Sequence, residues 1–200
     1  MIHSPSLYQR IPGLVLGFHG CDEAVGEAIL KTPGAHIKSS DNAWDWLGAG
    51  IYFWENDPVR AHEFAEMKRR HPGISKTAIK RPFVIGAVID LGLCCNLLDR
   101  TALVEVKESY RSLKRVYEAG GVQMPENTGT EGVWRHLDCA VIENMHLLRR
   151  DTDSPEYDTV RGLFWEGTEL YPNSGMKSKN HVQIVVRNKA CIRGYFRPLA

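Results

Sequence analysis

The sequence predicts an α+β domain whose sheet is largely antiparallel. Strand-like segments lie near both ends of the chain, at residues 14–18 and 181–186, with helical patterns between them. Residues 83–90 are apolar almost throughout and rich in β-branched side chains, which is typical of a buried strand. Strands at both ends with helices between them favour an α+β arrangement. For a chain of 200 residues we expect a single domain that spans residues 1–200.

The first quarter of the chain predicts a strand, a helix and a second strand. The apolar run 14–18 leads into His19, and Asp22 is placed to cap a helix over residues 23–31. A polar loop and an aromatic segment follow, and a glycine-rich turn then leads into a strand at 51–54.

The next helix has a clear start signal. Asp57 can accept a hydrogen bond from first-turn amides, and Pro58 follows at the first helical position, where its missing N–H is not needed. One face of this helix carries four apolar residues, Ala61, Phe64, Ala65 and Met67. We expect the basic segment 68–72 to end the helix in a solvated loop.

The second half of the chain predicts two helical segments and two strands. Helical periodicity covers residues 101–118, and a loop rich in Gly, Asn and Thr follows over 120–132. Residues 136–150 continue as helix or mixed structure. The chain then becomes β-like at 162–165 and 181–186, with a polar loop over residues 167–180 between them.

Charge, hydropathy and cysteine content argue against several classes of protein. The 25 Lys and Arg residues nearly balance the 24 Asp and Glu residues, so there is no electrostatic basis for tight, nonspecific nucleic-acid binding. The sequence has no apolar run of about 18 residues and no signal-peptide pattern, so we expect neither a membrane span nor export by that route. Five cysteines without a CxxC pair favour reduced thiols and a cytoplasmic location.

Two common kinds of catalytic centre have little support. His136 and Cys139 have an i, i+3 spacing that suits a metal ion, but no second pair with ligand spacing accompanies them. We therefore expect no metal. The sequence also lacks a nucleophile-elbow pattern, which argues against a hydrolase of that type.

The candidate site lies at two glycine-containing strand ends. His19 precedes Gly20, whose missing Cβ would let a ligand reach the main-chain amide and carbonyl. In the segment Gly48-Ala49-Gly50-Ile51-Tyr52-Phe53, two closely spaced glycines mark a bulge or a close backbone approach. Tyr52 is then placed to stack on a flat ring with its hydroxyl free. The alternatives are a histidine that packs in the core and a pair of packed aromatic side chains.

These motifs resemble the first two signature motifs of the ADP-ribosyltransferases, in the branch of diphtheria toxin and the poly(ADP-ribose) polymerases. Phe18-His19-Gly20 and Gly48-x-Gly50-Ile51-Tyr52-Phe53 occur in the order of that family, with Ala61 following in a helix. The two motifs cover about a quarter of the chain directly. The resemblance implies an ADP-ribosyltransferase-like split β-sheet core with flanking helices, and NAD in the cleft between two mutually tilted sheets.

The resemblance also implies roles for individual residues. His19 would hold the adenosine-side ribose, Gly20 would bind the nicotinamide carboxamide, and Tyr52 would stack on the nicotinamide. Phe64 is the candidate for a second stacking wall. NAD would be a co-substrate, and three further motif residues are expected to contact it: Gly50, Ile51 and Ala61.

Two positions depart from the family pattern. The third family motif is a glutamate in a late strand, but the matching strand, 181–186, offers Gln183, which can bond a ribose hydroxyl and cannot take a proton. Glu166 is the candidate for the missing carboxylate, with a surface turn carboxylate as the alternative. Arg60 stands where relatives have a small hydroxyl residue, and we expect it to reach the pyrophosphate.

Together, the residues and the resemblance predict a mono-ADP-ribosyltransferase, a glycosyltransferase that cleaves NAD and passes ADP-ribose to a protein or nucleic acid. The resemblance allows a bacterial toxin or effector with a neutralising antitoxin as a partner, and no membrane partner is expected. Three alternatives stay open. They are an NAD glycohydrolase, an RNA 2′-phosphotransferase-like enzyme that would use Arg161, Arg187 and Arg193, and a non-catalytic module that binds NAD or ADP-ribose, which Gln183 supports.

Overall fold

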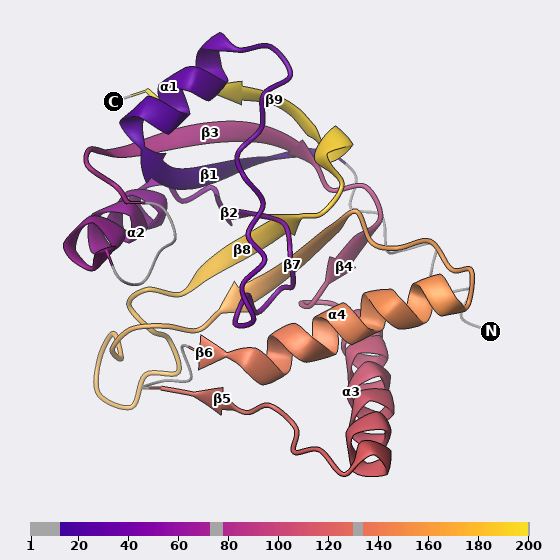
Figure 1. The fold of residues 1–200 in the computed structure, drawn as a ribbon. Helices are drawn as coiled ribbons and strands as arrows, with labels where there is room; N and C mark the ends of the chain where they lie inside the picture. Colours follow the sequence, from indigo (N-terminus) through magenta and orange to yellow (C-terminus); the bar gives the residue numbers. More distant parts are fainter. Residues whose placement is uncertain (1–12, 73–77, 130–133, 200) are drawn as a thin grey trace.

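The computed structural model describes residues 13–72, 78–129 and 134–199, which form a mixed sheet of seven strands, a two-stranded ribbon and four α-helices (Figure 1). The strands of the large sheet are β1 (Leu14–Asp22), β2 (Ile51–Glu55), β3 (Pro82–Asp90), β4 (Cys94–Asn96), β7 (Thr159–Phe164), β8 (His181–Val186) and β9 (Ile192–Phe196). The helices and the ribbon are α1 (Glu23–Lys31), α2 (Pro58–Arg70), α3 (Arg100–Gly120), α4 (His136–Asp151), β5 (Asn127–Thr128) and β6 (Trp134–Arg135).

The strand order of the large sheet is β4-β7-β8-β2-β1-β3-β9. β4 and β7 run parallel, and the other neighbouring strands in the described residues pair antiparallel. The prediction of an α+β fold with a largely antiparallel sheet is therefore confirmed. None of the helices in the described part of the chain has the length and apolar character needed to cross a bilayer.

The large sheet consists of two halves that share a short joint. β1 pairs with β3 over all nine residues of β1. In contrast, β1 pairs with β2 at two positions, Gly17 opposite Glu55 and Phe18 opposite Trp54. β9-β3-β1 thus form one half and β2-β8-β7-β4 the other, and Figure 1 shows the second half running obliquely to the first. α1 and α2 accompany the first half, whereas α3 and α4 pack on each other beside the second.

The predicted helices are confirmed, and their caps explain why they start where they do. Asp22 caps α1 by accepting a hydrogen bond from Ala24 N at 3.0 Å. Asp57 caps α2 by accepting one from Arg60 N at 2.8 Å, with Pro58 at the first helical position. α3 covers the predicted segment 101–118, and the segment after residue 136 forms one continuous helix, α4.

Several boundaries differ from the prediction. β1 continues to Asp22 instead of ending at His19, because its whole length pairs with β3. α2 continues through Arg70, so Lys68 lies in its last turn and not in a loop. Met67, predicted for the apolar face of α2, is exposed. The short strands β4 and β9 have no predicted counterpart. The predicted loop 120–132 contains β5, and its residues after 129 lie outside the described residues.

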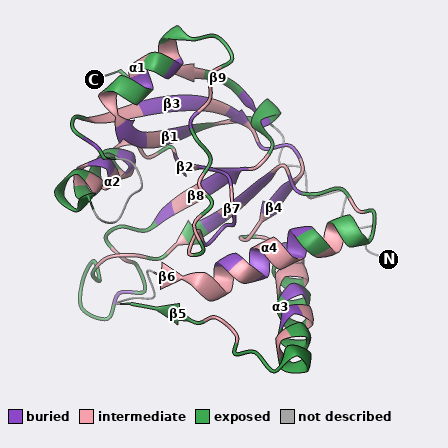
Figure 2. Ribbon diagram, viewed as in Figure 1, coloured by how far each residue is buried: buried purple, intermediate pink, exposed green. Residues whose placement is uncertain are grey.

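The core lies along the central strands, which Figure 2 shows as mostly buried. Ile51, Phe53 and Ile85 are completely buried in one apolar cluster, and Val160 and Val185 belong to a second cluster that includes residues of α4. The five cysteines are free and buried. Burial raises the pKa of four of these thiols to about 11 and also raises that of the fifth; the four are Cys21, Cys94, Cys139 and Cys191, and the fifth is Cys95.

His146 is a buried histidine in α4 without a hydrogen-bond partner. Its side chain is 0% exposed, and neither ring nitrogen is hydrogen-bonded. Glu156 Oε2 lies 3.7 Å from its Nδ1. The pKa of His146 is lowered to about 4, mainly by burial, with a contribution from the nearby Arg187 guanidinium. The ring is therefore neutral at pH 7.

We expect the free energy of unfolding to fall as the pH drops from about 6.5 to about 4. The unfolded chain takes up a proton at the ordinary histidine pKa near 6.5, whereas folded His146 does so only near 4. The unfolded state therefore binds more protons in this window, and His146 alone costs about 3 kcal/mol of stability at pH 4.5. Urea unfolding at pH 7.5 and 4.5 measures the difference. His146→Leu should reduce the difference in unfolding free energy between the two pH values, whereas His62→Leu at an exposed position of α2 should not. An equal difference in the wild type and in both variants would contradict the attribution of this pH dependence to His146.

Candidate functional site

His19 lies where the two halves of the sheet separate. Its Nδ1 donates a hydrogen bond to Tyr52 O at 2.7 Å. Since a carbonyl oxygen only accepts, Nδ1 carries the proton and Nε2 keeps its lone pair. The pKa of His19 is lowered to about 4, mainly by burial; the bond to Tyr52 opposes this shift and the charge of Lys68 adds to it. The neutral ring thus offers Nε2 as an acceptor, which suits a hydroxyl group.

The Tyr52 hydroxyl is not free, so that part of the prediction is wrong. It donates to Gly48 O at 2.9 Å and accepts from Leu47 N at 3.0 Å. Burial raises the pKa of Tyr52 well above its ordinary value, so the hydroxyl stays protonated. The side chain fixes the turn that precedes its own strand, and it packs against the second apolar cluster.

An ion pair between helix α4 and the residue that follows β8 holds the same turn. Glu143 Oε1 in α4 accepts from Ala49 N at 2.6 Å and from Arg187 at 2.7 Å. Arg187 also donates to Ala49 O at 3.1 Å. Burial opposes the charge on Glu143, but the hydrogen bonds from Arg187 and Ala49 keep its pKa below the usual value. Both polar main-chain groups of Ala49 are therefore bound by one ion pair.

Four predicted contact residues have packing roles. A Cβ on Gly20 would lie 2.0 Å from Ala61 O, and a Cβ on Gly50 would lie 2.6 Å from Val185 Cγ2. Both glycines are therefore required by the close approach of α2 and β8. Ile51 and Ala61 are 0% exposed, so their side chains belong to the core.

Gln183 forms a directed series of hydrogen bonds. Trp46 Nε1 donates to Gln183 Oε1 at 2.7 Å, and Gln183 Nε2 lies 3.1 Å from His181 Nε2. His181 Nδ1 donates to Lys179 O at 2.7 Å, so His181 Nε2 is the acceptor for the amide. Burial lowers the pKa of His181, which keeps it neutral. These bonds set the orientation of the Gln183 amide.

Glu166 and Arg60 are brought together although they are far apart in the sequence. Arg60 donates to Glu166 Oε2 at 2.6 Å and to Glu63 Oε2 at 2.9 Å. His181 Nδ1 lies 3.9 Å from Glu166 Oε2. Glu166 is therefore not an isolated surface carboxylate. The Arg60 guanidinium forms ion pairs with two carboxylates, which compensate its positive charge. This arrangement does not favour the predicted contact of Arg60 with the pyrophosphate.

A series of five aromatic rings crosses this region from the loop before β2 to helix α2. The successive ring centroids are 5.3, 5.4, 6.2 and 4.9 Å apart in the order Trp46, Phe164, His181, Trp54 and Phe64. A cation lies at each end, Arg135 over Trp46 and Lys68 over Phe64. Trp54 is 3% exposed and its Nε1 has no hydrogen-bond partner; Arg60 Nε is likewise buried and unpartnered. Two buried donors without acceptors thus lie among the candidate residues.

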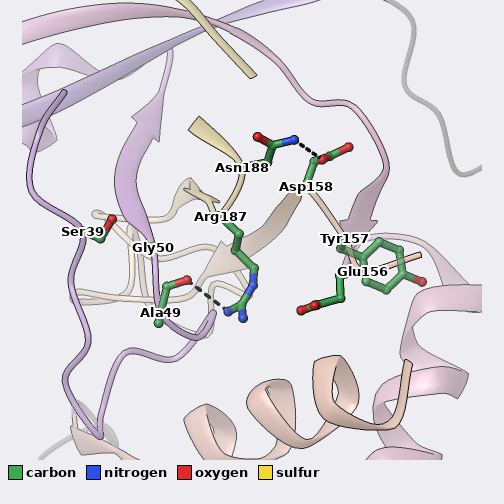
Figure 3. Close-up of a pocket in the computed structure, with 8 residues that line it drawn as sticks. All are labelled: Ser39, Ala49, Gly50, Glu156, Tyr157, Asp158, Arg187 and Asn188. Carbon is green, nitrogen blue, oxygen red and sulfur yellow. Dashed lines mark hydrogen bonds between the residues drawn. The ribbon is translucent and has the colours of Figure 1, made fainter. Parts of the chain in front are cut away.

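A separate hollow of about 480 Å³ opens beside Arg187 (Figure 3). Gly50 is the predicted NAD contact among its lining residues, whereas His19, Phe64 and Glu166 lie elsewhere. Two hydrogen bonds link groups that line it: Arg187 donates to Ala49 O, and Asn188 Nδ2 donates to Asp158 Oδ1 at 2.7 Å. Because most of the predicted site residues lie outside this hollow, the region around His19 and the ring series remains the candidate site.

The residues that favoured other kinds of site have partners of their own. Arg161 pairs with Glu55, Arg187 with Glu143, and Arg193 with Asp90. His136 packs against Trp44, and Cys139 Sγ lies 3.6 Å from Asn42 O. Among the described residues, no group of three or more His, Cys, Asp or Glu side chains is arranged to hold a metal ion.

Sequence reasoning missed the aromatic residues Trp46 and Trp54 and the cation Lys68. Trp54 directly follows the Tyr52-Phe53 pair, and its i+2 spacing from Tyr52 on a strand was a usable signal for a shared face. Trp46 and Lys68 had no local signal, because their partners come from distant segments.

Comparison of the chain with protein-family models, with curated proteins and with solved structures found no match in any of the three.

We expect Gly20→Ala to destabilise the protein by about 3 kcal/mol or more, because the added methyl group would collide with Ala61 O in α2. Gly194→Ala is the matched control, since a Cβ there meets no atom within 4 Å among the described residues. Chemical denaturation measures both. Equal stabilities of the two variants would show that α2 moves aside, and the packing role of Gly20 would be wrong.

We expect Gln183→Glu to raise the pKa of His181, because a carboxylate beside Nε2 favours the imidazolium. NMR titration of the histidine ring protons measures this change. Gln183→Leu, which adds no charge, should leave the pKa of His181 low. If His181 titrates alike in the wild type and the Glu variant, then Gln183 and His181 do not share the hydrogen bond described above.

Proposed function

We propose that the chain binds NAD in the gap between the two halves of the sheet and cleaves the bond between nicotinamide and ribose. The observation that carries this proposal is His19, a neutral ring fixed by Tyr52 O with Nε2 as an acceptor. A ribose hydroxyl is a matching donor. The two-position joint between β1 and β2 supports the finer expectation of an ADP-ribosyltransferase-like split sheet.

The neighbouring residues fit other parts of NAD. The unpartnered donors Trp54 Nε1 and Arg60 Nε suit the carboxamide oxygen or a ribose hydroxyl. A buried donor that water does not reach gains a hydrogen bond when a ligand brings an acceptor to it. The Phe64 and Tyr52 rings offer apolar faces for the flat nicotinamide. Gln183 can donate its remaining amide hydrogen to a ribose hydroxyl.

The reaction would be dissociative. The C–N glycosidic bond lengthens, positive charge develops on the ribosyl carbon, and nicotinamide leaves with the bonding electron pair. An oxygen or nitrogen of the acceptor then bonds to that carbon and releases its proton. Fixed dipoles around the ribose lower the barrier without a covalent intermediate. Glu166 is the candidate base, and it must separate from Arg60 before it can take the proton.

The same proposal includes an acceptor that is a protein or a nucleic acid, a cytoplasmic location and a role as a toxin or effector with an antitoxin partner. An NAD glycohydrolase would differ in using water as the acceptor. The RNA 2′-phosphotransferase alternative has less support, since the three arginines that suggested it are held in ion pairs.

A non-catalytic NAD-binding module is the second candidate. It is favoured by the Gln183 amide, which cannot take a proton, and by the pairing of Glu166 with Arg60. Nicotinamide release separates this candidate from the enzyme.

We expect the purified protein to release free nicotinamide from NAD, measured by chromatography. His19→Ala should abolish the release, because it removes the nitrogen proposed to accept a hydrogen bond from the ribose. Glu166→Gln should bind NAD as the wild type does in calorimetry, yet pass ADP-ribose to the acceptor or to water at least about 100-fold more slowly. Glu63→Gln removes the other carboxylate on Arg60 and should retain activity. Binding without release would identify the non-catalytic module, and the absence of NAD binding would overturn the proposal.

A further inference from the structure

We propose that Lys68 is the cation that receives the diphosphate of NAD, an inference that rests on the proposed function. The ammonium group lies at the α2 end of the ring series, with Nζ 4.4 Å from the centroid of the Phe64 ring. Lys68 and Phe64 are four residues apart, so both lie on one face of α2.

The charge of Lys68 acts on groups from two other elements around the gap. It lowers the pKa of His19 in β1, and the carboxylate of Asp45, in the loop before β2, acts on Lys68 in turn. Charges act on one another over several ångströms, so these effects indicate that the ammonium, besides lying over Phe64, is in the neighbourhood of β1 and of that loop. In NAD the diphosphate joins the two riboses, and His19 in β1 is the residue proposed to hold one of them.

Lys68 differs from the other cations near the candidate site in its partners. Four arginines around the site are each held by a carboxylate at 2.9 Å or less: Arg60, Arg135, Arg161 and Arg187. Within the described ranges, no carboxylate oxygen lies within 4.0 Å of Lys68 Nζ. An anionic ligand can thus bind Lys68 without displacing an ion pair.

The surroundings of Lys68 also favour an anion. The side chain is half-buried, and burial lowers its pKa because the charged form loses water. A diphosphate brings compensating negative charge to this place, and a lysine suits phosphate oxygens as a compact point charge. Arg60, in contrast, is already neutralised by Glu63 and Glu166. Lys68 therefore takes the role that the sequence predicts for Arg60.

The test compares ligands with and without the diphosphate. Calorimetry would measure binding of NAD, ADP and nicotinamide riboside, which lacks phosphate, to wild-type protein and to Lys68→Gln. We expect Lys68→Gln to weaken NAD and ADP binding by about 10- to 100-fold, as for the loss of one charge-assisted hydrogen bond, and to change nicotinamide riboside binding by less than about 2-fold.

Two further variants control for charge and folding. Arg69→Gln removes the same charge from the next position of α2, where Arg69 pairs with Glu66, and should leave NAD binding unchanged. Lys68→Arg keeps the charge and should retain most of the NAD affinity. Thermal unfolding midpoints identify any variant that fails to fold.

Each contrary outcome has a distinct meaning. Equal NAD binding by the wild type and Lys68→Gln overturns the role of Lys68 and leaves the proposed function standing. An equal loss for nicotinamide riboside and NAD shows that Lys68 supports the shape of the site, which also overturns the inference. If the wild type binds neither NAD nor nicotinamide riboside, the proposed function fails and the inference fails with it.

Discussion

The arrangement of the candidate site depends on the short joint between β1 and β2. Beyond Phe18 opposite Trp54, β1 stays with β3 and β2 stays with β8, so the two strands diverge. At this divergence His19 of β1 donates a hydrogen bond to the main-chain carbonyl of Tyr52 in β2. The gap in the sheet and the histidine that bridges it are thus one feature, and it also fixes the protonated nitrogen of that histidine.

The turn before β2 connects this joint to the rest of the molecule. Tyr52 bonds Gly48 O and Leu47 N, whereas Glu143 and Arg187 bind both main-chain groups of Ala49. Residues from β2, α4 and the end of β8 therefore determine one short loop. A chain of hydrogen bonds thus runs from α4 through this turn to Tyr52, and from Tyr52 O to His19.

The sequence could predict what local signals encode and little of what distant residues decide. The caps Asp22 and Asp57 and the buried strand 83–90 depend on neighbours within a few positions, and they lie where expected. Motif order pointed to His19 and Tyr52 as candidate site residues. It did not predict the hydrogen bonds of the Tyr52 hydroxyl, because the sequence is the same whether that hydroxyl is exposed or bonded. The partners Arg60 and Glu166 are 106 positions apart, and Trp46 and Gln183 are 137 apart, so only the folded chain brings them together.

Alkylation of the buried cysteines can show whether the two halves of the sheet, which share the short joint between β1 and β2, open together. Their raised pKa values keep the thiols protonated and unreactive in the folded protein, so an alkylating reagent reacts only when a segment opens. Cys21 and Cys191 accompany the half formed by β1, β3 and β9 and pack in the first apolar cluster, whereas Cys95 lies in β4 at the far edge of the other half and packs in the second cluster. The rates at which Cys21 and Cys191, and separately Cys95, are alkylated therefore report the opening of two different parts of the molecule. Equal rates would indicate a sheet that opens as a single unit. Different rates would indicate that the two halves, which are joined by two residue pairs between β1 and β2, open independently.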